Sequence, residues 1–349
     1  MNKKFRSQIC IVCIMVLVMA MFVGCGGNAS EGGSGEDVVY ELSWAGIGST
    51  DSIDTWIGEE AAKRISEKTD GKVKINVYPA SQLGDITQAY DEIMQGTIDM
   101  GLFTIYGTYD IFCEVLYTPF LTSNYDEFKE IYGRDGVLYQ TYQEVQDEYG
   151  ISLLGFWPSG YLGVGFAKIN DTSTLFDFDV KKKDLVRAPG MDSMILSVES
   201  MGFNSTVINY ADVYTALQTG VCDGSWNGGA YANYTSFRDV LNYFVDYRAC
   251  NDVYCCIMNS EKMGSLPKEY QEIISQVIEE VIDDGIAKIE AQDEQSIQDM
   301  KDYGIEVISP TDAQRVTMRD YFVSNVWPQL YKFYGEEFMT QLADEVSSL

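Results

Sequence analysis

Arg187 is the residue whose type and position in this sequence most directly suggest binding chemistry. It is one of only eight arginines in a chain that carries 53 acidic residues and a formal net charge of −29. It lies near the end of a short segment, Asp184–Ala188, and Pro189 and Gly190 follow at once. A planar guanidinium donates two parallel hydrogen bonds to a carboxylate. Two interpretations follow: Arg187 binds the carboxylate of a ligand, or it forms an internal salt bridge with one of the many acids.

Aromatic residues stand at the ends of several predicted strands. Trp44, Trp157 and Trp226 each end such a segment, and Tyr106 follows another. In open α/β sheets, ligands bind beyond the carboxyl ends of the strands. These residues are therefore candidates for an aromatic cleft that covers the body of a ligand, although packing in the core is a competing interpretation for each tryptophan. Two further candidates are Tyr161 and Tyr254.

The elements that must position these residues alternate between strand and helix. The periodicity predicts a strand over 38–45, a helix over 52–68 and a strand over 72–78, and the alternation continues to residue 226. This order is typical of α/β layers with mostly parallel sheets. A long amphipathic helix is predicted from Pro267 to Tyr303, about 55 Å at 1.5 Å per residue. Its apolar stripe is wider than a coiled-coil seam, which favours a strut across two lobes over a coiled-coil partner helix.

The composition excludes several classes of site. The chain has no histidine, so Ser-His-Asp catalysis, Cys-His catalysis and histidine-ligated zinc cannot occur in it. The negative charge disfavours nucleic acid and anionic lipid as partners. Five cysteines follow residue 25, an odd number without a CxxC pair, so we interpret them as core residues and expect neither a metal site nor a cofactor.

The N-terminus has the pattern of an export signal. Lys3, Lys4 and Arg6 precede an uncharged apolar run over 9–23. Phe22–Cys25 resembles a bacterial lipoprotein box, with Phe in place of the usual Leu. We therefore expect a signal peptide over 1–24, lipidation of Cys25 and a flexible Gly/Ser tether over 25–37. Plain secretion and an uncleaved anchor are the alternatives.

A set of short motifs, in order along the chain, resembles one known family. The resemblance covers about residues 38–345, and its motifs are Glu67–Val73, Tyr78–Gly84, Gly96–Met100, Thr118–Leu121, Gly155–Trp157, Val186–Pro189, Ala211–Gly224 and Leu266-Pro267. The sequence is similar to the solute-binding subunits of TRAP (tripartite ATP-independent periplasmic) transporters, of the dicarboxylate-binding type. Each motif is weak alone, but their order is specific.

The resemblance implies a two-lobed α/β fold of the periplasmic-binding-protein kind (type II-like), braced by the long helix. It implies lobe I over 38–157 and 253–292, and lobe II over 158–252 and 293–349, with hinges near 157–160 and 248–253. The family's selectivity arginine falls on Arg187 and its pocket asparagine on Asn227. Many members carry a second arginine where this chain has Leu162. That departure argues against a ligand that needs two cationic contacts.

The predicted function is therefore that of a non-enzymatic receptor. We expect it to act as a monomer, lipid-anchored on the extracytoplasmic face, and to deliver a small organic acid to TRAP permease subunits. The expected ligand is a monocarboxylate with an apolar or aromatic body, such as an oxo acid or an aryl acid. A sensory receptor that docks to a membrane kinase remains an alternative, and an exported hydrolase with paired carboxylates is a weaker one.

Overall fold

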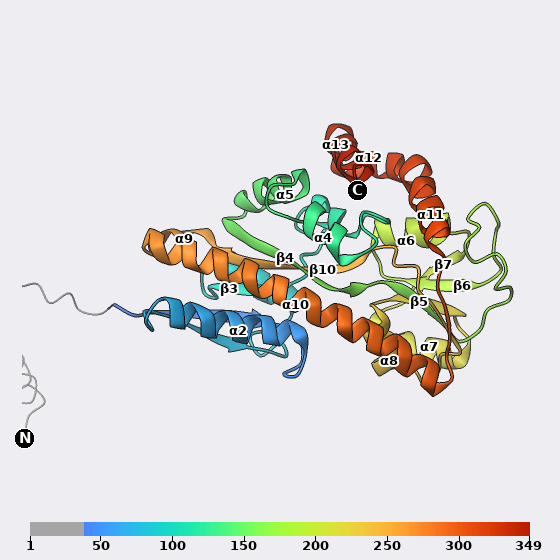
Figure 1. Ribbon diagram of the computed structural model, residues 1–349, viewed down its shortest axis with the longest axis horizontal. Helices are drawn as coiled ribbons and strands as arrows, with labels where there is room; N and C mark the ends of the chain where they lie inside the picture. Colours follow the sequence, from blue (N-terminus) through green and yellow to red (C-terminus); the bar gives the residue numbers. More distant parts are fainter. Residues whose placement is uncertain (1–37) are drawn as a thin grey trace, which may run out of the picture. The chain divides into compact units, whose positions relative to one another are not determined.

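Two β-sheets organise the protein in the computed structural model, which describes residues 38–349 (Figure 1). The predicted signal peptide, Cys25 and the whole predicted tether lie outside the described residues. The two sheets form the cores of two lobes, which confirms the predicted two-lobed α/β fold.

The first sheet has five strands, each with apolar residues on at least one buried face. In spatial order they are β2 (Val73–Tyr78), β1 (Tyr40–Gly46), β3 (Met100–Phe103), β10 (Asn251–Asn259) and β4 (Ile151–Tyr161). The helices of this lobe are α2 (Ile53–Lys68), α3 (Ile86–Met94), α4 (Tyr125–Ile131), α5 (Val137–Asp147) and α9 (Ser260–Ser265), with the 3-10 helix η2 (Ile111–Tyr117). Within the predicted strand–helix alternation, the apolar pattern over 125–149 favours one continuous helix. Two form instead, because the Gly133–Gly136 segment interrupts the periodic run.

The second sheet has six strands. In spatial order they are β11 (Glu306–Ile308), β9 (Tyr243–Val245), β5 (Gly163–Phe166), β8 (Gly224–Asn227), β6 (Leu185–Ala188) and β7 (Asn204–Val207). The accompanying helices are α6 (Asp192–Ser200), α7 (Val213–Thr219) and α8 (Ala230–Phe237), with the 3-10 helix η3 (Tyr210–Asp212). A separate small core that includes Val213, Phe237 and Phe244 lies in this lobe.

Both sheets are mixed, and not mostly parallel as the strand–helix alternation predicted. β10 pairs antiparallel with β3 and β4, and β5 pairs antiparallel with β8 and β9. The physical reason is the path of the chain. It leaves the first sheet through β4 into β5 and returns through β9 into β10, so the outgoing and returning strands run in opposite directions.

The chain passes between the sheets twice, from β4 to β5 and from β9 to β10, and these two segments, called the crossings, lie side by side. The amide of Leu162, between β4 and β5, donates to the carbonyl of Cys250, just before β10, at 2.8 Å. Arg248 in the returning segment has a φ of 49°, a left-handed conformation that costs free energy for a residue with a side chain. Its guanidinium lies over the Tyr161 ring, 4.4 Å from the centroid. The crossings are therefore joined by hydrogen bonding and ring contact.

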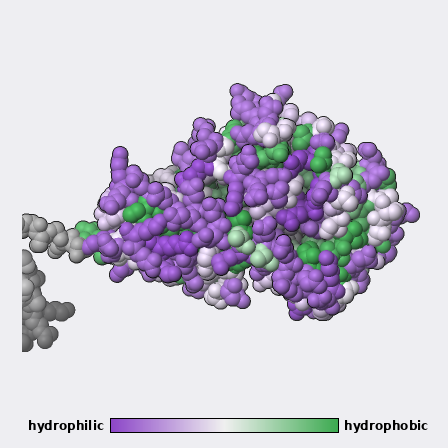
Figure 2. Space-filling model, viewed as in Figure 1, coloured by the Kyte–Doolittle hydropathy of each residue, from purple (hydrophilic) through white to green (hydrophobic). Residues whose placement is uncertain are grey.

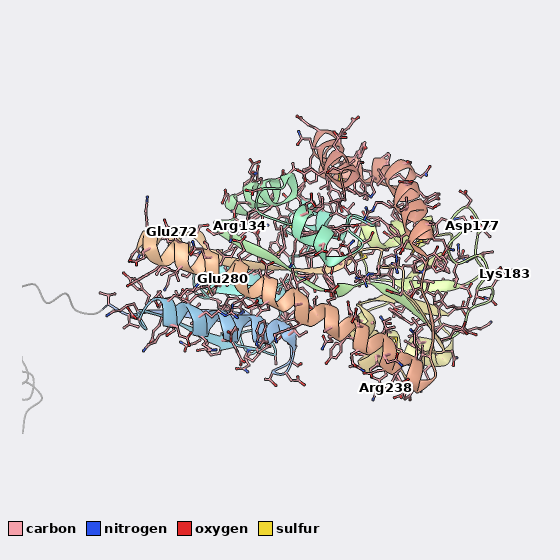
Figure 3. The ribbon with its side chains drawn as sticks, viewed as in Figure 1. Arg134, Asp177, Lys183, Arg238, Glu272 and Glu280 are labelled. Carbon is pink, nitrogen blue, oxygen red and sulfur yellow. The ribbon has the colours of Figure 1, made fainter. Side chains whose placement is uncertain are left out.

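Helix α10 (Lys268–Tyr303) spans both lobes, as the periodicity predicted. It packs against α2 and β4 of the first lobe and against α8 and β11 of the second. Gly285 permits this close approach, because a Cβ there would lie 2.5 Å from Ile57 Cδ1 and 2.7 Å from Trp157 Cζ3. Salt bridges fix α2 along the same helix, with Lys68 to Glu280 at 2.8 Å and Arg64 to Asp284 at 2.7 Å. Figure 3 labels Glu280 on α10.

The C-terminal helices are α11 (Asp312–Asn325), α12 (Trp327–Tyr334) and α13 (Glu336–Ser347). The sequence assigned them to lobe II, whereas α12 packs against η2 and α13 against α5, both in the first lobe. The Trp327 indole N–H donates to the carbonyl of Pro119 at 2.9 Å, in a buried contact. The chain therefore returns to the first lobe because its last helices bury their apolar faces there.

The face of the molecule shown in Figure 2 is mostly hydrophilic, with separate apolar patches, which fits an acidic chain. Within residues 38–349, no helix is both long and apolar enough to cross a membrane. The five cysteines of the described region are buried free thiols, in agreement with their interpretation as core residues.

Candidate ligand-binding site

A cavity of about 330 Å³ lies between the two sheets. This volume is within the usual range for small-molecule sites. One wall comes from the first lobe, and its residues are Ile47, Ile86, Thr104, Tyr106, Tyr117, Asp252 and Tyr254. The other comes from the crossing and the second lobe, and its residues are Leu162, Arg187, Pro189, Met191, Met194, Tyr210, Trp226 and Gly228. A ligand in this cavity would contact both lobes.

Arg187 lines the cavity from strand β6 and is only 5% exposed. Its Nε donates to the carbonyl of Ile208 at 2.8 Å, and its Nη1 donates to the carbonyl of Trp226 at 3.2 Å. Burial lowers its pKa, while the nearby Tyr210 and Cys222 oppose that effect. Two neutral carbonyls thus orient a buried guanidinium that arginine chemistry keeps charged at neutral pH.

Three predicted aromatic residues, Tyr106, Trp226 and Tyr254, line the same cavity as Arg187. Asn227 follows Trp226 in β8, opposite Gly163 of β5, but its side chain lies outside what the structure describes. Leu162 also lines the cavity and presents an apolar side chain to it.

The other three aromatic candidates lie elsewhere. Trp44 is buried beneath α2, where a Cβ on Gly58 would lie 3.1 Å from its indole ring. The Trp157 indole N–H donates to Asp54 Oδ1 at 2.6 Å, and its ring lies under Gly285 of α10. Their side chains fill the contact between sheet and helices, so they shape the lobe without lining the cavity.

Tyr161 belongs to the crossing between the lobes. Its hydroxyl donates to the carbonyl of Asn124 at 2.6 Å, and the guanidinium of Arg248 lies over its ring. It does not line the cavity. The structure thus places this tyrosine where the chain changes lobes.

An acidic group that sequence reasoning did not single out, Asp252, lines the cavity from the first lobe. The Tyr117 hydroxyl donates to Asp252 Oδ1 at 2.9 Å and lies 3.1 Å from the Thr104 hydroxyl. The search for residues at carboxyl ends of strands missed Asp252 because it lies at the amino end of β10. That strand runs antiparallel to β3, so its amino end meets the carboxyl end of β3 at the cavity.

Burial raises the pKa of Asp252 to about 6, and the nearby charge of Asp54 acts in the same direction, while the Tyr117 hydrogen bond opposes both. Burial likewise raises the pKa of Asp54, against the hydrogen bonds from Trp157 and Ser159. The cavity therefore has a cationic wall at Arg187 and an acidic wall at Asp252. Among residues 38–349, no three His, Cys, Asp or Glu side chains form a cluster suited to a metal ion.

Two similar proteins are each 28% identical to this chain over the aligned residues. A solute-binding protein from Chromohalobacter salexigens is 28% identical over 216 residues, which are 57% of this chain and 62% of that protein. The C4-dicarboxylate-binding periplasmic protein DctP from Rhodobacter capsulatus is 28% identical over 264 residues, which are 72% of this chain and 75% of that protein.

Solved structures share the fold. A TRAP periplasmic solute-binding protein from Desulfovibrio salexigens with bound orotic acid has a TM-score of 0.75 and 24% identity. The match covers 88% of this chain and 99% of that one. The sequence profile named DctP, for bacterial extracellular solute-binding protein, family 7, matches residues 49–332. The chain therefore belongs to the DctP family of bacterial extracellular solute-binding proteins, family 7.

Proposed function

We propose that this protein captures a small organic acid outside the cytoplasmic membrane and delivers it to the permease subunits of a TRAP transporter. The observation that carries the proposal is the position of Arg187, a buried cation in the wall of a cavity between two lobes. An anion that enters a strongly acidic protein needs such a fixed cation, because an unpaired buried charge costs several kcal/mol.

The ligand that this cavity fits is a monocarboxylate. Arg187 is the one lysine or arginine among the cavity-lining residues of the described chain, and Leu162, where the family resemblance leads us to expect a second arginine, adds an apolar side chain to the wall. A second carboxylate on the ligand would meet Asp252, an acid, on the opposite wall. This sets the proposal apart from the C4-dicarboxylate specificity in the name of the Rhodobacter relative.

The remaining contacts follow from the cavity walls. Trp226, Tyr106 and Tyr254 cover the body of the ligand, and Asn227, beside Trp226 in β8, donates a further hydrogen bond to its carboxylate. Because the ligand touches both lobes, it favours the closed arrangement, with the two crossings as hinges. Catalysis is not part of this proposal, because the family to which the chain belongs consists of solute-binding proteins.

Attachment to the membrane belongs to the same proposal. Cys25 carries a lipid, the segment after it is the tether, and the receptor works as a monomer on the extracytoplasmic face. Replacement of Cys25 with Ser should release the mature chain from the membrane fraction. A sensory partner in place of a permease would use the same cavity, so neighbouring genes for permease subunits or for a kinase distinguish the two roles.

A thermal-shift screen of organic acids with the full chain tests the proposal. A ligand that binds only the folded state raises the melting temperature with the logarithm of its concentration. We expect one or more monocarboxylates to raise it and dicarboxylates of similar size to leave it unchanged. Stabilisation by dicarboxylates or uronates alone would contradict the monocarboxylate assignment, and stabilisation by no organic acid would contradict the proposed function.

A further inference from the structure

Asp252 gives the cavity a second recognition point that the capture of a plain monocarboxylate leaves unused. It lines the cavity from the first lobe, whereas Arg187 lines it from the second. The Tyr117 hydroxyl donates a hydrogen bond to one of its carboxylate oxygens at 2.9 Å, and no described residue donates to the other oxygen. Within residues 38–349, no lysine or arginine forms a salt bridge with Asp252. A carboxylate is thus presented to the cavity without a protein cation beside it.

The surroundings of Asp252 add to its negative potential. Asp54 lies close enough for its charge to raise the pKa of Asp252, and Asp54 has no salt bridge within the described residues either. Three tyrosines, Tyr106, Tyr117 and Tyr254, line the same part of the cavity and feel the charge of Asp252. Carboxylates combined with electron-rich rings form the usual environment for an ammonium group.

We propose that the ligand is a zwitterion, with a carboxylate bound by Arg187 and an ammonium group bound by Asp252. This inference rests on the proposed function and names the substrate class of the same site. A ligand of this kind brings a carboxylate to Arg187 and an ammonium group to Asp252, so the charge of Asp252 and both charges of the ligand are compensated when the lobes close and exclude water. A neutral hydroxyl in place of the ammonium would donate a hydrogen bond to Asp252 but would leave the charge of Asp252 uncompensated.

The test compares matched ligands that differ at one group. Calorimetry with the full chain in mild detergent would use α-aminobutyrate, γ-aminobutyrate and ε-aminocaproate, which differ in the separation of the two charges. Each would be measured beside two analogues in which a methyl or a hydroxyl replaces the ammonium. In at least one set we expect the amino acid to bind at least about tenfold more tightly than both analogues, as for the loss of one buried charge pair.

Two variants test whether the preference for an ammonium ligand depends on Asp252. Asp252→Asn keeps an oxygen for Tyr117 but removes the charge, so the preference for the ammonium ligand should disappear. Asp293→Asn is the matched control, because Asp293 is also buried, also accepts from a tyrosine (Tyr125, 2.7 Å) and also has a pKa raised to about 6, but it does not line this cavity. The control should keep the preference.

The outcomes separate this inference from the proposed function. Methyl analogues that bind as tightly as the amino acids in every set would overturn the zwitterion and leave the organic-acid receptor standing. Equal binding of hydroxyl and ammonium members, or a preference that survives Asp252→Asn, would also overturn it. If no carboxylate of any set binds although the thermal-shift screen finds an organic acid that does, the inference fails and the proposed function stands. If the screen also finds none, both fail.

Discussion

The hydroxyl of Tyr117 donates to Oδ1 of Asp252 at 2.9 Å, across the boundary between η2 and β10. The bond stabilises the ionised form of the carboxyl, so it holds the pKa of Asp252 below the value that burial alone would give. Tyr117→Phe should therefore raise this pKa above about 6. A carboxyl-carbon NMR titration measures the shift. Tyr125→Phe, which removes the equivalent bond to Asp293, should leave Asp252 unchanged, and an unmoved Asp252 in Tyr117→Phe would refute the assignment.

Loss of the Arg187 charge should weaken ligand binding strongly. Arg187→Gln is expected to cost about 2–5 kcal/mol of binding free energy, because a buried ligand carboxylate would lose its partner. Calorimetry with the best ligand of the thermal-shift screen measures the change. Arg134→Gln is the control, since Arg134 also donates to a carbonyl (Leu154, 2.6 Å) but lies outside the cavity. Equal losses in both variants would show that the effect comes from the fold and not from the site.

Glu114 should make the protein less stable as the pH rises. Burial, with Asp192 acting in the same direction, raises its pKa from 4.5 to about 7, and its Oε2 is buried without a hydrogen-bond partner. Between pH 4.5 and about 7, the folded state therefore binds more protons than the unfolded state. Ionisation of the buried Glu114 does not lower the free energy of unfolding below pH 4.5, and it lowers that free energy as the pH rises through about 7.

Glu114→Gln removes this dependence. Its melting temperature should exceed that of the parent above pH 7, and the difference should shrink toward pH 4.5. Scanning calorimetry over this range measures both, with the exposed Glu130 replaced by Gln as control. A difference that does not vary with pH would exclude titration of Glu114 as its cause.

Replacement by alanine should lower the free energy of unfolding at Gly285 and raise it at Gly264. Replacing a helical glycine with alanine usually stabilises by about 0.5–1 kcal/mol, and at Gly264 the new Cβ would have no atom within 4 Å beyond its chain neighbours and the adjacent backbone of its own helix. At Gly285 the Cβ would meet Trp157 Cζ3 at 2.7 Å, so overpacking should cost about 1–3 kcal/mol. Urea unfolding of both variants measures the free energies. Stabilisation by Gly285→Ala would mean that α10 does not pack this tightly on the first lobe.

Ligand binding should draw the lobes together. The cavity walls come from both lobes, and α10 and the two crossings connect them, so a bound ligand favours the closed population. Small-angle scattering should show a smaller radius of gyration at saturating ligand. Identical curves with and without a ligand that calorimetry shows to bind would rule closure out.

The sequence by itself determined much of the local structure, and it identified Arg187 and three of the aromatic residues that line the cavity. Apolar periodicity and the flanking Pro267 and Gly304 defined helix α10, because such signals act within a few residues of each other. Arg187 could be identified for the same reason, as a rare cation at the carboxyl end of a parallel strand, and the ordered motifs identified the family.

The tertiary structure alone decided which residues share the cavity. Asp252 lies at the amino end of its strand, and only the antiparallel register of β10 with β3 brings it beside Tyr106 and opposite Arg187. Trp157 has the same local pattern as Trp226, yet the helices α2 and α10 cover it, while Trp226 faces the cavity. Strand direction and helix packing depend on contacts between residues more than a hundred positions apart, and local sequence patterns do not encode them.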